Sequence, residues 1–206
     1  MELESLYVIE REGSEQVRSW SVPSSLFRYG LAQGLEAQLQ IPFIDEKRYV
    51  ADELISSRRI FEQAQLGFSL DLWKQRGAIP ETALMYRALV PVMDFQPNEV
   101  GHLLALNMSN ALGERITLNY NLGWMLGHGE QLGYYIVNCS YELNALLRCF
   151  VEVFGEITLA GISANCLNTG ISFTFTDSLC LDLSYAMGID HDMTYFGGNL
   201  SYCFNF

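Results

Sequence analysis

The chain has few charged residues and almost no lysine. Charged side chains make up 17% of its 206 residues, against about 25% in an average soluble domain. Lys47 and Lys74 are the only lysines, and 12 cations face 24 carboxylates, which gives a formal net charge of −12. Nucleic-acid binding depends on cations placed against phosphates, so we expect no nucleic-acid partner. The same net charge disfavours attraction to anionic lipid surfaces.

Long apolar runs are also missing, although half of the residues are hydrophobic and 13% are aromatic. No window offers the roughly 18 consecutive apolar residues that a membrane helix needs. The first residues, Met1 to Glu4, lack the basic and apolar regions of an export signal, so we expect an exported protein to carry this sequence as a mature or trimmed form. High apolarity without a long run fits many strands that each have one apolar face.

Motifs for catalysis or metal binding are scarce. The five cysteines show neither Cys-x-x-Cys nor zinc-like spacing, and no glycine-rich phosphate loop or hydrolase signature occurs. Asp190-His191-Asp192 resembles a metal-binding triplet, but a solvated turn is the better interpretation. A cross-strand disulfide between Cys180 and Cys203 is conceivable, and buried free thiols are favoured. We therefore expect no catalytic residue, no metal and no cofactor, and a protein that is not an enzyme.

The chain is rich in residues that alternate in polarity. From Ile116 to Leu126, large apolar side chains alternate with Thr, Asn, Gly and Met, and a period of two repeated six times cannot be a helix. The pattern recurs over residues 6–11, 16–29, 35–41, 64–72, 82–92, 103–110, 135–143, 147–153, 169–175, 179–187 and 193–206. These lengths approach the 9–11 residues of a tilted membrane strand. The sequence predicts an all-β fold, a single antiparallel transmembrane β-barrel of about 12 strands that occupies residues 1–206 as one domain.

The polar face of the strands decides between this barrel and a soluble β-sandwich or lipocalin-like binder. A sandwich would present a solvated face rich in Lys and Glu. Here that face carries Asn, Ser, Thr, Gln and Gly, which fits a narrow polar lumen better. Tight turns also alternate with longer connections, as in outer-membrane barrels. We predict the longest loop from Ile44 to Glu62, with a helical turn conceivable between Ala51 and Ser57.

The last strand predicts a location. Leu200, Tyr202, Phe204 and Phe206 form one apolar face that ends on an aromatic residue. Such an ending resembles the insertion signal of bacterial outer-membrane barrels, so we expect Tyr202, Phe204 and Phe206 to serve as that signal. The expected partners are then outer-membrane lipid and the barrel-insertion machinery.

Several segments together resemble one family of outer-membrane proteins. They are Leu26-Phe27-Arg28-Tyr29-Gly30-Leu31, Leu35-Glu36-Ala37-Gln38-Leu39, Pro42-Phe43, Asn119-Tyr120-Asn121-Leu122-Gly123, Val151-Glu152-Val153-Phe154-Gly155-Glu156, Leu179-Cys180-Leu181-Asp182-Leu183 and Gly198-Asn199-Leu200-Ser201-Tyr202. The sequence is similar here to the outer-membrane transporters labelled for the MetA pathway of phenol degradation. The resemblance implies a barrel with a transport role beside aromatic degradation, and it runs from about residue 16 to the end.

Charged and amide side chains on the polar face are the candidate lumen or constriction residues. They are Glu36, Asp71, Arg87, Asn119, Asn121, Glu142, Arg148, Glu152 and Asp182. Such a ring could filter solutes by charge. The favoured interpretation is structural, because arginines among carboxylates would pair, cross-link the strands and close the lumen.

These observations lead to one principal hypothesis for function and three alternatives. We expect a passive transporter or channel for small solutes, hydrophobic or aromatic ones among them. The main alternative is a closed structural or accessory barrel of a larger outer-membrane complex, with envelope proteins as partners. A barrel enzyme and a soluble binder are further alternatives.

Overall fold

The computed structural model describes all residues except 62, 93–99, 128–129, 160 and 205–206. In this part the chain forms one antiparallel sheet of fifteen strands. The strands are β1 (Glu2–Glu12), β2 (Glu15–Ser21), β3 (Ser24–Ala32), β4 (Leu35–Ile41), β5 (Ile44–Val50), β6 (Glu53–Ile60), β7 (Gln63–Trp73), β8 (Glu81–Pro91), β9 (Gly101–Leu112), β10 (Ile116–Gly127), β11 (Glu130–Asn144), β12 (Leu147–Thr158), β13 (Gly161–Thr176), β14 (Leu179–Gly188) and β15 (Asp192–Tyr202). No helix of the described residues is long and apolar enough to cross a membrane.

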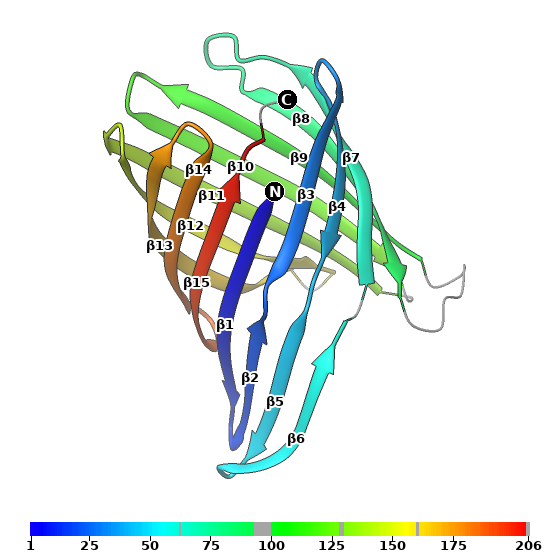
Figure 1. Ribbon diagram of the computed structural model, residues 1–206. Coiled ribbons are helices and arrows are strands. Elements are labelled where there is room, and N and C mark those ends of the chain that lie inside the picture. Colours follow the sequence, from blue (N-terminus) through cyan, green and yellow to red (C-terminus); the bar gives the residue numbers. More distant parts are fainter. Residues whose placement is uncertain (62, 93–99, 128–129, 160, 205–206) are drawn as a thin grey trace.

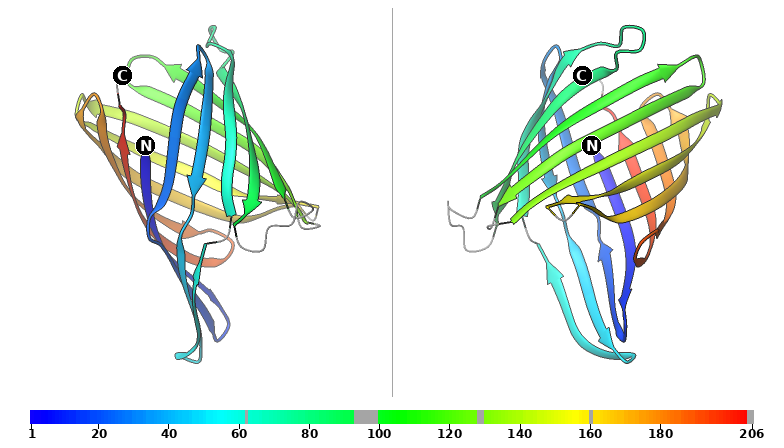
Figure 2. Two further views of the ribbon diagram at one scale, coloured as in Figure 1. Left: turned by 45° about the vertical axis from the view of Figure 1, so that its right-hand side comes forward. Right: turned by 180° about the vertical axis from the view of Figure 1, so that it is seen from behind.

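Twelve of the described strands close into a barrel. The first strand pairs with the last over a continuous register from Glu2↔Ser201 to Arg11↔Asp192. The order around the barrel is β1, β3, β4 and then β7 through β15, which can be followed by the labels of Figure 1 and the matching colours of Figure 2. The Met1 ammonium group donates to the carbonyl oxygen of Tyr202 at 2.8 Å, so the start of β1 and the end of β15 lie at one end of the barrel, here called the termini end (Figure 1). The predicted fold class is confirmed.

Large apolar side chains cover the outside of this barrel. On β7, Leu66, Phe68 and Leu70 are exposed, while the residues between them point inward. The same outward exposure is found for Leu104, Leu106, Leu122, Trp124, Val137, Val151, Ile171, Leu183, Phe196 and Leu200. A soluble monomer rarely exposes a contiguous apolar patch above a few hundred Å². This exterior is suited to lipid contact, as the alternation predicts.

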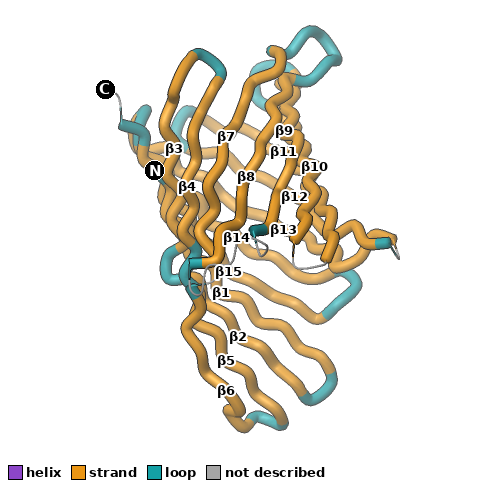
Figure 3. The backbone as a smooth tube through the Cα atoms, turned by 90° about the vertical axis from the view of Figure 1, so that its right-hand side faces the viewer, coloured by secondary structure: helices purple, strands orange, loops and turns teal. Residues whose placement is uncertain are grey.

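Three strands continue beyond the barrel at the far end, opposite the termini end. Strands β2, β5 and β6 join the far half of β1 in a four-stranded sheet, here called the extension (Figures 1 and 3). Pro23 separates β2 from β3, and Pro42 separates β4 from β5. Because proline lacks an N–H donor and fixes its backbone, these two positions mark where the strands leave the barrel wall.

The extension corrects one expectation, because the predicted loop from Ile44 to Glu62 is wrong. Residues 44–60 form the β5–β6 hairpin, and Glu62 itself lies outside the described residues. Ala51 and Asp52, where a helical turn was conceivable, have φ of 49° and 66°. Two left-handed residues in a row are typical of a tight hairpin turn. The many charges on both faces of this hairpin concealed its strand pattern.

Gly67 offers a test of the close approach between β7 and β8. A Cβ atom at Gly67 would collide with the carbonyl oxygen of Tyr86 and lie 2.7 Å from Cγ of Arg87. Gly67→Ala should therefore lower the free energy of unfolding by about 1–3 kcal/mol, the usual cost of overpacking. Gly30→Ala is the matched control, since a Cβ there meets nothing within 4 Å. Urea midpoints of the folded, heat-modifiable form should separate the two variants, and equal midpoints would contradict this close approach.

Candidate functional site

Polar side chains inside the barrel are aligned in rows across neighbouring strands. The first polar row follows the strand register through Glu4, Asn199, Asp182, Ser172, Arg148 and Glu142. Within it, Asn199 donates to Asp182 at 3.3 Å, and the half-exposed Arg148 and Glu142 form an ion pair at 3.3 Å. Because side chains alternate between faces, one register position brings residues far apart in the sequence to one line.

A second polar row runs beside the first across the same part of the barrel wall. It contains Asn168, Glu152, Asn138 and Asn119 in register. The side-chain amides of Asn138 and Asn168 each donate to the Glu152 carboxylate at 3.1 Å. Glu152 thus accepts hydrogen bonds from neutral donors on both sides, and no cation of the described residues lies within 4.0 Å of its carboxylate.

A third row joins Asn121, Asn107, Ala83 and Asp71. Asn121 donates to Asn107 within this row. At its end, Lys74 contacts Asp71 at 3.0 Å and Glu81 at 3.2 Å. These hydrogen bonds raise the pKa of Lys74, which lies in the turn after β7. Asp71 is therefore a paired residue near the termini end of the barrel.

The first two rows line a central cavity of about 700 Å³. Its polar lining consists of Glu4, Asn119, Asn138, Ser140, Arg148, Glu152, Asn168, Ser172, Asp182, Ser184 and Asn199. Its other lining residues are Leu6, Val8, Ile136, Phe150, Phe154, Met193 and Tyr195. A neighbouring cavity of about 470 Å³ shares Asn119, Asn138 and Glu152 and also contacts Asn121. The interior is therefore amphipathic, with carboxylates and amides beside aromatic and aliphatic side chains.

Arg87 lies on a different part of the wall and is only 9% exposed. Its guanidinium group donates to Gln38 at 2.8 and 3.0 Å, to Gln65 at 3.1 Å and also to Gln40. No carboxylate of the described residues lies within 4.0 Å of it, so the expectation that Arg87 pairs with an acid is wrong, whereas Arg148 does pair. Three glutamine oxygens from β4 and β7 replace the carboxylate as acceptors.

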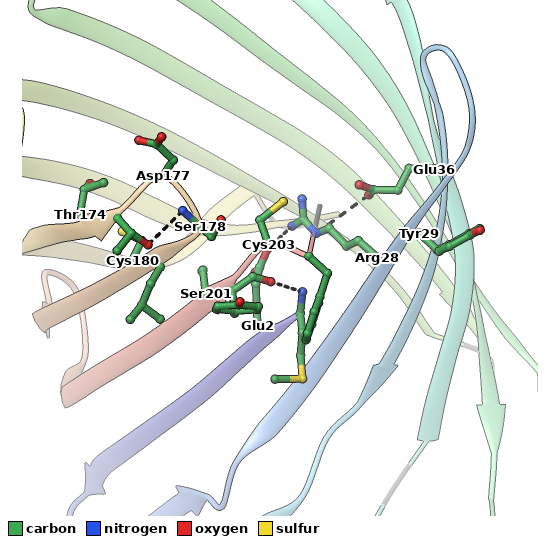
Figure 4. Close-up of a pocket in the computed structure, with 16 residues that line it drawn as sticks. Glu2, Arg28, Tyr29, Glu36, Thr174, Asp177, Ser178, Cys180, Ser201 and Cys203 are labelled. Carbon is green, nitrogen blue, oxygen red and sulfur yellow. Dashed lines mark hydrogen bonds and ion pairs between the residues drawn. The ribbon is translucent and has the colours of Figure 1, made fainter. Parts of the chain in front are cut away.

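Glu36 lies at a third cavity, of about 590 Å³, which opens at the termini end. Figure 4 shows Arg28 between Glu2 and Glu36, and its nitrogens approach these carboxylates at 3.1 and 4.0 Å. Cys180 and Cys203 both line this cavity, but no disulfide joins them.

Sequence reasoning placed the nine predicted residues on the correct face, and their role as a solute filter stays a prediction. It missed residues that complete the site: Glu2, Glu4, Arg28, Gln38, Gln40, Gln65, Asn138, Asn168 and Asn199. Their position in the alternation was a sufficient signal for most of them. Of the predicted insertion signal, Tyr202 and Phe204 are exposed, and their ring centres lie 4.6 Å apart in an edge-to-face contact. Phe206 lies outside the described residues.

The Asp190-His191-Asp192 triplet ties the turn after β14 to its neighbours. The Asp190 carboxylate accepts hydrogen bonds from the Asn165 backbone at 2.8 Å and from His191 at 2.9 Å. The hydrogen bond with His191 is the first cause that lowers the pKa of Asp190. Nε2 of His191 lies 3.9 Å from the Cys166 thiol, which is 2% exposed and lines none of the cavities described above. The cluster therefore anchors the turn.

Arg87 and Arg148 are a matched pair for a stability test. Arg87→Met removes the donor from three glutamines, and hydrogen bonds to charged groups contribute about 1.5–3 kcal/mol each to stability before compensation. We expect a loss of about 2–3 kcal/mol in the free energy of unfolding, measured by urea denaturation in detergent. Arg148→Gln breaks a half-exposed pair and should cost no more than about 1 kcal/mol. If Arg87→Met unfolded no earlier than Arg148→Gln, the glutamine cluster would not support the wall.

No family model matches the sequence, and no curated protein matches it. Solved structures do resemble it. The KdgM porin in complex with disordered oligogalacturonate has a TM-score of 0.65 and 7% identity over 100% of both chains. The translocator domain of autotransporter NalP from Neisseria meningitidis has a TM-score of 0.56 and 12% identity, over 98% of this chain and 86% of that one.

A transporter of hydrocarbons is also among the similar structures. The Pseudomonas putida toluene transporter TodX has a TM-score of 0.53 and 10% identity, over 93% of this chain and 70% of its own. At these identities the likeness concerns the fold. A closed barrel of twelve described strands, an apolar exterior and these three similar structures lead to the same conclusion: the chain has the fold of bacterial outer-membrane β-barrels.

Proposed function

We propose that the protein is an integral barrel of the bacterial outer membrane that lets small solutes pass passively. The observation that carries this proposal is the central cavity, which lies inside a closed wall whose outer surface is apolar. All strands of the described residues belong to the sheet that forms the wall and the extension, so no described strand fills the lumen. Insertion machinery and outer-membrane lipid are the partners that this proposal requires.

The charges of the cavity suggest a class of solute. Glu4, Glu152 and Asp182 line it, and its one cation among the described lining residues, Arg148, is already paired with Glu142. An acidic wall repels anions and attracts cations or neutral hydrogen-bond donors. Oligogalacturonate, the polyanion bound to KdgM, is therefore a poor candidate for this chain.

The apolar part of the cavity adds a second requirement. Phe150, Phe154 and Tyr195 offer aromatic surface beside the carboxylates. A small aromatic solute with a neutral or cationic polar group would meet both parts of the lining. This class agrees with the resemblance to transporters labelled for phenol degradation, and TodX, a toluene transporter, has a similar fold. The family label itself is part of the proposal.

A closed accessory barrel is the second candidate, and it is favoured by one observation. The Arg148–Glu142 pair and the amide contacts of Glu152 and Asp182 link adjacent strands of the wall. Such links could stabilise a lumen that never conducts. A barrel of this kind would act through envelope proteins as partners. Neither candidate requires an enzymatic activity.

Single-channel recording in a planar bilayer tests the conduit. The protein would be refolded in detergent, and its folding verified by the mobility shift of the unboiled sample. We expect discrete current steps with a reversal potential that indicates preference for cations in a salt gradient. Glu152→Gln combined with Asp182→Asn should reduce this preference, because two fixed negative charges leave the cavity wall. Glu15→Gln in the extension is the control and should leave the preference unchanged.

Two results would contradict parts of the proposal. Silence from verified folded protein would exclude the open conduit and favour the accessory barrel. Conductance with unchanged selectivity in the double variant would mean that the solute path avoids the central cavity.

A small aromatic amine should also interrupt the current more strongly than an aromatic carboxylate of similar size, as the acidic wall predicts.

A further inference from the structure

The two faces of the extension differ in charge. Strand register places Tyr7, Trp20 and Asp45 side by side on the outward face, which continues the lipid-facing wall along β1. Of the described residues, this outward face carries the cations Arg11, Arg18, Lys47 and Arg59 and the carboxylates Asp45 and Asp192. The opposite face carries the cations Arg48 and Arg58 and the carboxylates Glu10, Glu12, Glu15, Glu46 and Glu53. In a chain of net charge −12, the outward face of the extension therefore has an excess of cations, whereas its opposite face has an excess of carboxylates.

The cations of the two faces also differ in their partners. On the opposite face, Arg48 pairs with Glu15 at 3.0 Å and Arg58 with Glu46 at 2.9 Å. On the outward face, Arg11 pairs with Asp192 at 3.5 Å and Arg59 with Asp45 at 3.9 Å. Lys47 on this face, however, has no carboxylate within 4.0 Å among the described residues.

Arg18 is similarly without a carboxylate at that distance in the described part of the chain. It donates to the neutral side chain of Gln16 at 2.8 Å and lies 4.5 Å from the ring centre of Tyr49. A guanidinium group on an aromatic face keeps its charge available. Two adjacent cations, Arg18 and Lys47, are thus left for an external anion.

The outward face also changes in character with distance from the barrel. Next to the barrel lies a hollow of about 410 Å³ lined by Trp20, Val22, Phe43 and Ile44 together with the paired Asp45 and Arg59. One step further from the barrel lies a hollow of about 200 Å³ lined by Tyr7, Arg18, Trp20, Asp45, Lys47 and Tyr49. The largely apolar surface next to the barrel is therefore followed by a surface that carries the two cations without a carboxylate partner, Arg18 and Lys47.

This sequence of surfaces matches the layers of a bilayer. A strand rises about 3.3 Å per residue, so Arg18 lies about 7 Å beyond Trp20. The headgroup layer outside the hydrocarbon is about 5–7 Å thick on each side. With Trp20 at the edge of the hydrocarbon, where aromatic side chains gather, Arg18 and Lys47 reach the level of lipid phosphates.

We infer that the outward face of the extension binds a phosphate-bearing lipid headgroup of the leaflet at the far end, with Arg18 and Lys47 as its phosphate ligands. The orientation in the membrane rests on the proposed function. Net charge predicts no attraction to anionic lipid for the whole chain, and the extension is a local exception. If this face bound a protein partner or a second copy of this chain instead, replacement of Arg18 and Lys47 would leave lipid binding unchanged.

Native mass spectrometry of the detergent-refolded protein with diphosphorylated lipid A tests the inference. Each cation near an anionic surface contributes about fivefold in affinity, so Arg18→Gln with Lys47→Gln should weaken lipid A binding about thirtyfold. The matched control is Arg48→Gln with Arg58→Gln, which removes the same charge from the opposite face of the same sheet. It should leave the affinity within about twofold, and diacylglycerol, which has no phosphate, should bind both variants alike.

Three outcomes would overturn the inference. Equal weakening in both double variants would show non-specific attraction, and unchanged binding in the first would show that Arg18 and Lys47 are not ligands. Displacement of lipid A by inorganic phosphate at equal concentration would also overturn it, because it would identify a free-anion site. The measurement does not require conductance, so a silent barrel that still discriminates the two variants would refute the conduit alone.

Discussion

Closure of the sheet is the constraint on which the rest of this structure depends. In hydrocarbon a backbone N–H or C=O without a partner costs several kcal/mol, so a sheet that crosses a membrane must have no free edge. The register between β1 and β15 meets this condition through ten residue pairs, and the Met1 ammonium group adds a contact to Tyr202. Because closure fixes which face of every strand is inside, it also fixes the rows of the lumen.

The alternation of polar and apolar residues was enough to predict the closed barrel. It failed for strands that do not lie between lipid on one side and the lumen on the other. Ile116 to Leu126 borders lipid on one side and lumen on the other, so its apolar and polar residues separate cleanly. The β5–β6 hairpin has polar residues on both faces, and a two-residue period of polarity could not reveal it. Pairing was equally beyond the sequence, since nothing local indicates that Arg87 would meet glutamines from two other strands.

In the proposed conduit, the same side chains of the lumen would contribute to stability and to selectivity. Asn138 and Asn168 donate to the two oxygens of Glu152, so neutral amides rather than cations cross-link this part of the wall. Arg87 is satisfied in the same manner by neutral amides. An ion pair in these positions would have given similar cross-linking with no field in the cavity. Amide partners thus satisfy the hydrogen-bonding groups of Glu152 and Arg87 without adding an opposite charge beside them.

The far edge of β6 determines how deeply the barrel can sink into a bilayer. That strand ends the sheet of the described residues, so one side of it presents backbone donors and acceptors to its surroundings. Water can satisfy these groups and hydrocarbon cannot. The extension must therefore stay outside the apolar layer of the bilayer. Pro23 and Pro42, where strands leave the barrel wall, mark the greatest depth to which the protein can insert from this end. An open edge that is a liability in most sheets serves here as a stop for insertion.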